Sequence, residues 1–564
     1  MPGGLIPRIL HVPKWIAALG VCVTLLLASA PLRADTLIDN VNGITVGKDG
    51  EVERFAALLV SDDGRVRATY KRGERLPRLN ATRIDGKGRT LIPGIIDSHL
   101  HVMGIGFGAL TLDLSDTRSL PEALEKIRSF AAENPNRPWI LGRGWNQELW
   151  GLGRFPTAAE LDGAVADRPV WLERVDGHAG WANSAALRLA GVDAATADPA
   201  GGRVERGAGG APTGIFIDAA SDLVARVVPP PRAVERDRAF REAQEILHSF
   251  GVTAAADMGT TIEDWQTFRR AGDYGQLTLR VMAYAAGVEA MDLIGGSGPT
   301  PWLYGDRLRL NGIKLYLDGA LGSRGAWLKA PYADDAGNSG LQLIDDARLR
   351  NIMSRAAIGG FQIAAHAIGD AANAEALSAI HELAPSYDGD RRWRIEHGQI
   401  VDPSDIALFA SHGIIASMQP VHQISDRTMA EARLDPARLG GAYAWHTIGE
   451  TGAKLAFGSD APVEAPNPFA GMAAAISRTD RDGSPAGGWR PEERVTPAQA
   501  FAAFTADGAY AGFADGRFGR LVPGEWADFV LLDLDPLTAS PQQLYAARAR
   551  ETWVAGRQVY RAAQ

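Results

Sequence analysis

Eight short apolar runs, separated by longer stretches of helical character, constrain the fold of this chain more than any other feature. They cover residues 91–99, 251–259, 277–285, 312–319, 361–369, 392–399, 414–420 and 454–460. Continuous apolar runs of this length are typical of strands buried on both faces in a parallel sheet. Eight such strands alternating with helices predict an α/β fold, a (β/α)8 TIM barrel. The active site of such a barrel lies at the carboxyl ends of its strands, so the residues at these ends are the candidate functional residues.

The first of these runs ends in two histidines. His99 and His101 lie in the segment LIPGIIDSHLHVM, residues 91–103. Side chains alternate between the two faces of an extended chain, so both imidazoles point to the same side. Two imidazoles on one face at the end of a strand make half of a metal site. The alternative for an isolated pair of this kind is two hydrogen-bonded core histidines.

Polar side chains stand within or at the end of four other runs. They are Lys314 in the fourth run, His366 in the fifth, His397 in the sixth and Asp460 in the eighth. Taken singly, each has a structural explanation, such as a core histidine, a buried ion pair or a helix cap. A barrel brings the ends of all these strands around one mouth, so together they favour a metal site.

This set of residues resembles that of the metal-dependent amidohydrolase superfamily, in the family 3 subgroup that includes N-substituted formamide deformylases. Further matching segments are RVDGHAGWANS (174–184), DGALGSR (318–324), HAIGD (366–370) and GRLVPGEWADF (519–529). The resemblance implies a barrel with a composite β domain and a binuclear centre, usually zinc, bridged by a carboxylated lysine and a hydroxide. The residues that it assigns are His99, His101 and Asp460 on one metal ion, His366 and His397 on the other, and Lys314 as the bridge after reaction with carbon dioxide.

The residue types suit this chemistry. A neutral lysine amine is a poor bridge between two cations, whereas the carbamate of Lys314 would be an anionic ligand with two oxygens. The metal ions would lower the pKa of the bridging water and polarise the scissile carbonyl. Asp460 would accept a proton from the attacking hydroxide and pass it to the leaving amine. Asp97, Glu396 and Ser459 are candidates for hydrogen bonds that orient the ligands, with solvation or capping as their alternative roles.

The interpretation that follows is a hydrolase acting on an amide or formamide-like C–N bond outside peptide backbones. The first alternative is an amidohydrolase-type deaminase, which commonly holds one metal ion, lacks the bridging lysine and carries a glutamate shortly after the histidine of the fifth strand. Here Lys314 is present and Asp370 follows His366. Hydrolysis of an ester, lactone or carbamate is also open to the same hydroxide. An exported binding or regulatory protein without activity on this scaffold is the alternative of another class.

Short β segments with turn signals occupy both ends of the chain. Residues 35–92 and 519–564 predict one composite β-sandwich domain, with the barrel at 93–104 and 250–518. The remaining residues, 105–249, form an insertion after the first strand and include helical stretches at 121–133 and 235–250. An insertion at this point emerges on the active-site face, so we expect a lid or specificity subdomain.

Four further residues are candidates for substrate contact. His178 in the insertion, Arg324 after the fourth strand, and Gln419 and His422 after the seventh are all expected near the barrel mouth. A structural histidine is the alternative for His178, and a local ion pair is the alternative for Arg324.

The first 34 residues predict a secretory signal peptide. Basic residues precede an apolar run at 15–28, and small residues lead to a cleavage site after Ala34. The apolar run is short for a membrane span, although an uncleaved anchor is the alternative. The only cysteine, Cys22, lies inside this segment, so the mature chain is expected to be periplasmic or secreted without disulfides.

The charge of the chain argues against nucleic acid as a partner. Its formal net charge is −9 and its sequence contains no run of basic residues. A small-molecule substrate is the expected partner. The sequence leaves the oligomeric state open, with a homodimer as one alternative.

Overall fold

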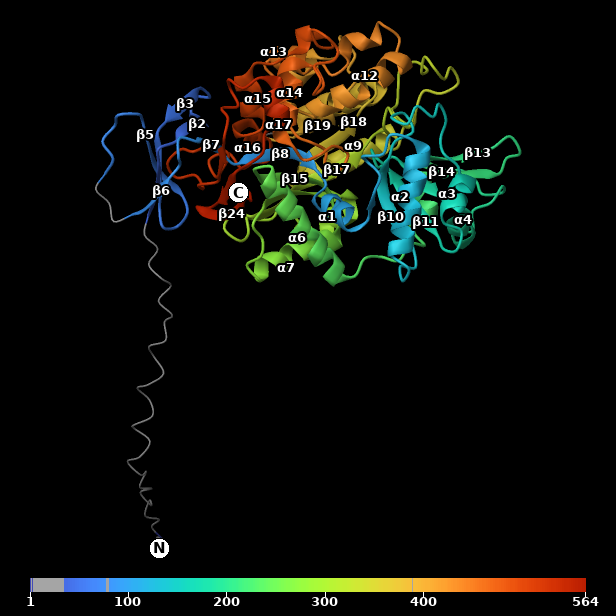
Figure 1. Ribbon diagram of the computed structural model, residues 1–564, viewed down its shortest axis with the longest axis horizontal. Coiled ribbons are helices and arrows are strands. Elements are labelled where there is room, and N and C mark those ends of the chain that lie inside the picture. The colour runs from blue at the N-terminus through green and yellow to red at the C-terminus, as the bar shows by residue number, and fades with distance from the viewer. Residues whose placement is uncertain (2, 4–34, 78–80, 388, 564) are drawn as a thin grey trace.

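The computed structural model describes residues 35–563 apart from 78–80 and 388, together with residues 1 and 3. Nearly all of the predicted signal peptide therefore lies outside the described residues. Within the described part of the chain, no helix combines the length and apolar character needed to cross a membrane. The elements fall into a barrel, a β region that joins both ends of the chain, and an insertion (Figure 1).

Eight parallel strands form the centre of the molecule, hydrogen-bonded in sequence order. They are β8 (Ile95–Leu100), β15 (Val252–Thr260), β16 (Arg280–Ala286), β17 (Leu308–Tyr316), β18 (Gln362–Ala367), β19 (Arg394–His397), β20 (Ile415–Met418) and β21 (Leu455–Phe457). The edge strands β8 and β21 meet just past β21, where the Asp460 amide donates to the His99 carbonyl at 2.7 Å. The sheet is thereby nearly closed, and the predicted (β/α)8 barrel is confirmed.

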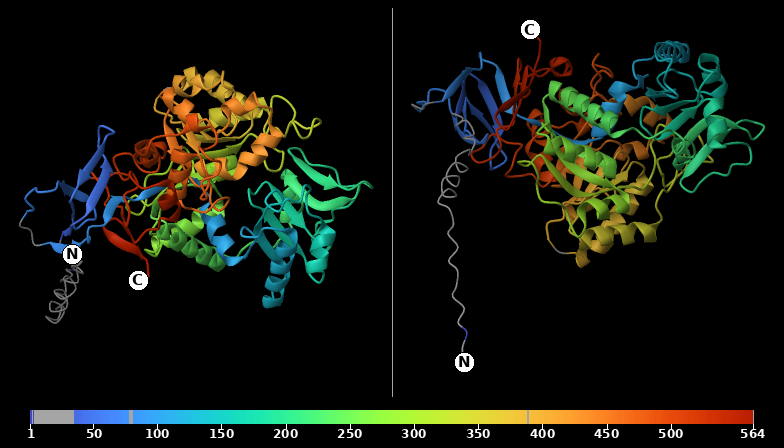
Figure 2. Two further views of the ribbon diagram at one scale, coloured as in Figure 1. Left: turned by 45° about the horizontal axis from the view of Figure 1, so that its top comes forward. Right: turned by 90° about the horizontal axis from the view of Figure 1, so that it is seen from below.

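Helices cover the outside of this sheet (Figure 2). Those of the barrel and of the C-terminal segment are α1 (Val102–Leu110), α6 (Ala233–Ser249), α7 (Ile262–Asp273), α8 (Gly287–Gly295), α9 (Asp346–Ile358), α10 (Asp370–Leu383), α11 (Ala407–Ser411), α12 (Pro420–Arg433), α13 (Trp445–Glu450), α14 (Pro468–Ser477), α15 (Pro497–Ala503), α16 (Ala506–Ala511) and α17 (Pro541–Ala546). Local sequence sets several of their starts. Thr261 and Asp264 form a capping box on α7. Proline at the first position of α12 and α14 lacks the N–H that would have no partner there.

The first predicted run, residues 91–99, is two strands instead of one. β7 (Thr90–Pro93) pairs with the terminal β region, and β8 belongs to the barrel. Gly94 separates them: its amide donates to the Asp528 carbonyl at 2.8 Å. A Cβ at Gly94 would lie 2.1 Å from the Thr253 hydroxyl, so only glycine fits this close approach. The expectation of one continuous strand was wrong because the chain changes sheets at this glycine.

The β region contains strands from both ends of the chain in one sheet. Its six-stranded sheet has the order β24 (Arg557–Arg561), β23 (Glu551–Val554), β22 (Phe529–Leu532), β7, β2 (Asn42–Val46) and β3 (Val52–Phe55). A second sheet has the order β5 (Val66–Tyr70), β4 (Ala57–Val60), β1 (Thr36–Asp39) and β6 (Thr82–Asp85). A shared apolar core that includes Leu58, Leu91 and Phe529 joins the two sheets.

The insertion builds a mixed sheet of its own at the opposite end of the barrel (Figures 1 and 2). Its strands, in sheet order, are β13 (Gly202–Arg206), β14 (Pro212–Asp218), β12 (Ala179–Ala182), β11 (Val170–Arg174), β10 (Ile140–Trp145) and β9 (Leu112–Asp113). Its helices are α2 (Leu120–Glu133), α3 (Ala158–Ala164), α4 (Ser184–Ala190) and α5 (Asp222–Ala225). Trp145 and Trp150 pack in its core against Trp181. Helix α6, in contrast, packs on the barrel, where a Cβ at Gly106 of α1 would lie 2.0 Å from the Ala239 carbonyl.

Candidate metal centre

His99 stands at the end of β8 and is completely buried. Its Nδ1 lies 2.6 Å from Glu396 Oε2 on β19. Glu396 is held in turn by Arg394, whose Nε donates to Oε1 at 2.6 Å. Burial raises the pKa of Glu396, but the Arg394 charge, the hydrogen bond to His99 and the charge of Lys314 together outweigh burial and lower it to about 2. An ionised Glu396 fixes the His99 ring so that Nε2 points into the barrel mouth, 3.2 Å from Lys314 Nζ.

Asp460 follows β21 and faces both histidines of the first strand. Its Oδ1 lies 3.4 Å from His99 Nε2 and 3.2 Å from His101 Nε2. Burial raises the pKa of Asp460, but the neighbouring imidazoles outweigh burial and hold it well below the ordinary value. The loop is positioned by Asp97, which accepts hydrogen bonds from the amides of Ser459 at 3.0 Å and His99 at 3.2 Å. The carboxylate of Asp460 is therefore an anionic acceptor at a fixed position.

His366 and His397 complete the ring of imidazoles. Their ring centroids are 4.5 Å apart, and those of His99 and His397 are 4.6 Å apart. Burial, followed by nearby cationic groups, lowers the pKa of both His366 and His397 well below the ordinary value. His397 Nδ1 lies 2.8 Å from Gln419 Oε1. Neutral imidazoles oriented in this way present lone pairs, which is the form that binds metals.

Lys314 on β17 is a buried amine beside these ligands. Its side chain lies between His99 and the ring of Tyr316, with Nζ 4.9 Å from the Tyr316 centroid. Burial lowers the pKa of Lys314 to about 8. A buried lysine with no carboxylate at contact distance in the described part of the chain is unusual, because charged groups are rarely buried without a partner.

These residues fit a metal site. One donor atom each of His99, His397 and Asp460 lies within 4.8 Å of the others. Three buried atoms of the site have no hydrogen-bond partner among the described residues. They are both ring nitrogens of His366 and Oδ1 of Asp460. Buried polar atoms without partners are costly, and a cation at the centre of this ring would satisfy them. The structure thus brings together all six residues assigned as ligands, and the role of each as a ligand stays a prediction.

The other candidates lie in different surroundings. Gln419 accepts from the metal-site histidine His397 and so orients it. His422 is buried, with Nε2 3.5 Å from Asp460 Oδ2. Arg324 is bound to Asp334, its Nη2 donating at 2.6 Å. Ser459 accepts at its hydroxyl from the Ala461 amide at 3.0 Å and so shapes the loop that carries Asp460.

His178 reaches the metal centre from the insertion. Its ring centroid is 5.2 Å from that of His366, and its Nδ1 lies 2.6 Å from Asp218 Oδ1. Strands β12 and β14 are antiparallel, and Ala179 pairs with Ile217. His178 directly precedes Ala179 and Asp218 directly follows Ile217, so the register places His178 and Asp218 opposite each other. Burial lowers the pKa of His178, but the hydrogen bond to Asp218 and the charges of Asp218, Asp176 and Asp318 together outweigh burial and raise it to about 9.

Three functional neighbours were missed by sequence reasoning. Asp218 orients His178, and Asp318 accepts from the amides of Trp327, Ile368 and Gly369 while lying 3.5 Å from His366 Nε2. Arg394 holds Glu396. The strand period could have found Arg394, which is two residues before Glu396 and therefore on the same face. Nothing local to Asp218 connects it with His178, forty residues earlier in the chain.

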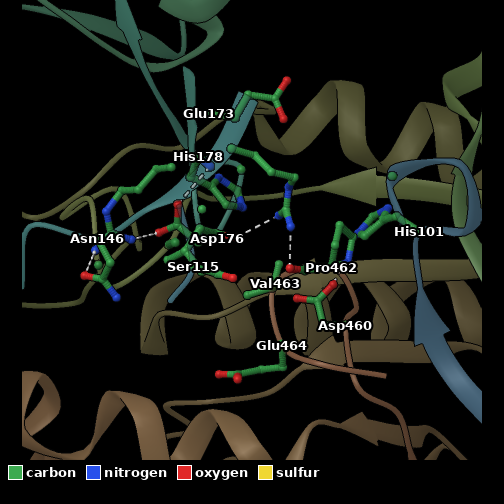
Figure 3. A pocket seen from close by; sticks show the side chains of 18 of the residues that line it. His101, Ser115, Asn146, Glu173, Asp176, His178, Asp460, Pro462, Val463 and Glu464 are labelled. Carbon is green, nitrogen blue, oxygen red and sulfur yellow. Dashed lines mark hydrogen bonds and ion pairs between the residues drawn. The ribbon is translucent and has the colours of Figure 1, made fainter. Parts of the chain in front are cut away.

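The metal centre opens into a cavity of about 1870 Å3. Helices α1 and α12, the loop after β21 and the insertion all contribute to its walls. Figure 3 shows Glu173 and His178 on the insertion side and Asp460, Val463 and Glu464 on the barrel side. A cavity of this size accommodates a small organic substrate beside the metal ligands.

Comparisons with known proteins agree with this geometry. A model described as amidohydrolase family matches residues 82–560. Protein LONG AFTER FAR-RED 3 of Arabidopsis thaliana is 34% identical over 491 residues, which cover 84% of this chain and 83% of that protein. N-substituted formamide deformylase of Arthrobacter pascens is 28% identical over 558 residues, 93% of this chain and 97% of the enzyme. The crystal structure of an uncharacterized metal-dependent hydrolase from Pyrococcus horikoshii has a TM-score of 0.73 at 25% identity, covering 90% of this chain and 99% of that one.

Proposed function

Because the chain belongs to the amidohydrolase family and is a metal-dependent hydrolase, we propose that it cleaves an amide or formamide-like C–N bond outside peptide backbones. The observation that carries the proposal is the convergence of four imidazoles, one lysine and one aspartate at a single barrel mouth. The name of the deformylase relative supports the choice of a formamide or related amide as substrate class.

Two divalent metal ions, with zinc as the preferred element, are proposed for this site. His99, His101 and Asp460 would hold one ion, and His366 and His397 the other. Imidazole and carboxylate ligands suit zinc. Lys314 would bridge both as a carbamate, formed when its nitrogen bonds to the carbon of carbon dioxide and releases a proton. The bridging role is supported by the position of Lys314 Nζ, which is buried and lies 3.2 Å from His99 Nε2.

Bound metal ions would supply a water of lowered pKa and would polarise the scissile carbonyl. The residues of the chain do the remaining work. Asp460 is placed to accept a proton from the attacking water, because it lines the cavity and, while Oδ1 faces His99 and His101, its carboxylate has a second oxygen, Oδ2. The same carboxyl group would then deliver that proton to the leaving nitrogen. Glu396 and Gln419 keep the imidazoles in orientation throughout.

Export is part of the proposal. It is supported by the basic, apolar and small-residue pattern of residues 1–34, and it makes the mature enzyme begin at Asp35. The partner would be a small molecule that enters the cavity from the periplasm or the medium.

The test is the number of metal ions per chain in mature protein produced with zinc and bicarbonate. We expect two in the native protein and one or none in Lys314→Ala. Lys454→Ala is the matched control, because Lys454 is an exposed lysine that pairs with Asp507 at 3.2 Å and is not among the proposed metal ligands. Full metal content and activity in Lys314→Ala would disprove the bridge. One ion per chain, unaffected by the variant, would favour the deaminase, and no metal would favour a binding protein.

Activity is then measured by release of amine from a panel of N-formyl and N-acyl amines. Turnover of these amides without turnover of the matching esters supports the proposed class. Turnover confined to esters, lactones or carbamates would reassign the substrate while leaving the metal site intact.

A further inference from the structure

Arg143 is a charged side chain that the insertion places next to the metal centre. It lies on β10 and lines the cavity. Its Nη1 donates to the carbonyl of Pro462 at 2.5 Å, and its Nη2 donates to the carbonyl of Val175 at 3.1 Å. Pro462 is two residues after Asp460. The guanidinium is therefore fixed between the insertion and the barrel loop that carries Asp460.

The charge of Arg143 has no counter-ion at contact distance. Of the three other arginines that line the cavity, Arg174 pairs with Asp176 and Arg433 with Glu148, whereas Arg118 forms no ion pair with a described residue. Within the described structure, no carboxylate oxygen comes within ion-pair distance of Arg143. A guanidinium keeps its charge at any pH the protein experiences, and two carbonyls occupy only two of its five N–H donors. The remaining donors can be satisfied by an anion or by water.

Glu173 is the adjacent charged residue, yet it does not pair with Arg143. The two residues are register partners on the parallel strands β10 and β11, and both line the cavity. The Glu173 side chain stays exposed, and no ion pair joins it to any described residue. The Arg143 guanidinium instead donates to the carbonyl of Pro462, which Figure 3 shows on the Asp460 side of the cavity.

Helix α1 presents a glycine to Arg143. Gly108 of α1 lines the cavity, and a Cβ at this position would have Arg143 Cδ, at 3.5 Å, as its nearest neighbour. His101, the residue just before α1, lines the same cavity, which therefore extends from the metal-site residues to Arg143. Arg143 therefore shares one cavity with the metal-site residues, and the α1 residue beside its Cδ is a glycine, which adds no side chain there.

We propose that Arg143 is a substrate-binding residue that pairs with a carboxylate or other oxyanion on the substituent of the amide substrate. The inference rests on the proposed function for the identity of the reaction, but the anion subsite itself does not require turnover. Guanidinium and carboxylate groups form paired, charge-assisted hydrogen bonds, which give both affinity and orientation. The substrate class is thus narrowed to amides that carry a negative charge away from the scissile carbonyl.

The first experiment compares two substrates that differ only in charge, para-(formamidomethyl)benzoate and its methyl ester. The measured quantity is the ratio of kcat/KM for the acid to that for the ester. We expect Arg143→Gln to lower this ratio by about tenfold or more, since a charge-assisted pair is lost. Arg143→Lys should retain part of the preference because it retains the charge.

Glu173→Gln is the matched control, and it should change the acid-to-ester ratio of kcat/KM in the opposite direction. It removes a negative charge next to the same subsite without touching the carbonyls that hold Arg143, so the ratio should rise. A fall in kcat/KM that is equal for acid and ester in Arg143→Gln would overturn the proposal, because Arg143 would then only position the loop of Asp460.

Binding separates this inference from the proposed function. Calorimetry with metal-loaded protein uses the uncleavable methanesulfonamide analogues of the same acid and ester. Tighter binding of the acid that disappears in Arg143→Gln supports the subsite even if no amide is turned over, an outcome that would defeat the proposed function alone. Tighter binding of the acid that survives in Arg143→Gln would place the carboxylate elsewhere, on the metal ions for example, and would overturn the proposal.

Discussion

The barrel mouth and the insertion wall of the cavity are built in different ways. In the mouth, the proposed ligands stand at or just after strand ends, most are fully buried, and their orienting partners are themselves barrel residues such as Glu396 and Gln419. On the insertion wall, His178 and Arg143 are only partly buried and are held by contacts between separate elements. Under the proposed function, the hydrogen-bonded network of the mouth would hold the metal ions, and the insertion would supply substrate contacts. Changes in the first should alter metal content, and changes in the second should alter kinetics alone.

Replacing Asp460 should have the largest effect. In Asp460→Asn the carboxylate that faces His99 and His101 loses its charge, so both metal binding and proton transfer suffer. We expect kcat to fall by about a thousandfold or more, with at least one metal ion lost per chain. Assays of kcat and metal content measure this, and removal of metal by a chelator should give the same loss. The exposed Asp482→Asn is the control, and substantial activity in Asp460→Asn would remove the proton-transfer role.

A second prediction concerns the support of His99. Glu396→Gln removes the anion that accepts from His99 and leaves Arg394 buried without its partner. Metal affinity should fall by about 10–100-fold, which is typical for loss of a residue that orients a ligand. Breaking one side of a buried ion pair should also lower the free energy of unfolding by about 3–5 kcal/mol. Competition with a chelator and thermal unfolding measure the two effects.

Glu382→Gln serves as the control for Glu396, because Glu382 is exposed and pairs with Arg350 on the outside of the barrel. Unchanged metal affinity in Glu396→Gln would mean that packing alone orients His99.

A third prediction moves to the insertion. His178→Ala should reduce kcat/KM by about 10–100-fold while metal content stays full, because His178 faces the cavity beside His366 and is assigned no metal. Asp218→Asn should have a smaller effect of the same kind, and the double variant should cost less than the sum of the two. Loss of metal from His178→Ala would contradict the division between mouth and wall.

The same division explains what could be predicted from the sequence. The proposed ligands were found because strand ends and strand periodicity are local properties, and a parallel barrel converts them into one site. Asp218 and Arg143 could not be found in this way, since their partners lie in other elements and depend on how the insertion docks. Gln419 lies at the mouth as expected but is bound to His397. The change of sheets at Gly94 depends on Thr253, more than 150 residues later, and no local pattern encodes that contact.

The smallest effect is expected at Arg324, and it tests where the substrate-contacting wall ends. Arg324 belongs to the loop after β17, yet its guanidinium is held by Asp334 at 2.6 Å and its side chain is 28% exposed. Arg324→Gln should therefore change kcat and KM by less than about twofold and stability by no more than about 1 kcal/mol, as for other partly exposed ion pairs. Arg433→Gln is the informative counterpart, because Arg433 is buried, donates to the Leu321 carbonyl at 2.5 Å and pairs with Glu148 of the insertion. Its loss should loosen the insertion and raise KM more than Arg324→Gln does. A large rise in KM for Arg324→Gln would instead put this barrel loop on the substrate, and the substrate wall would then extend beyond the insertion.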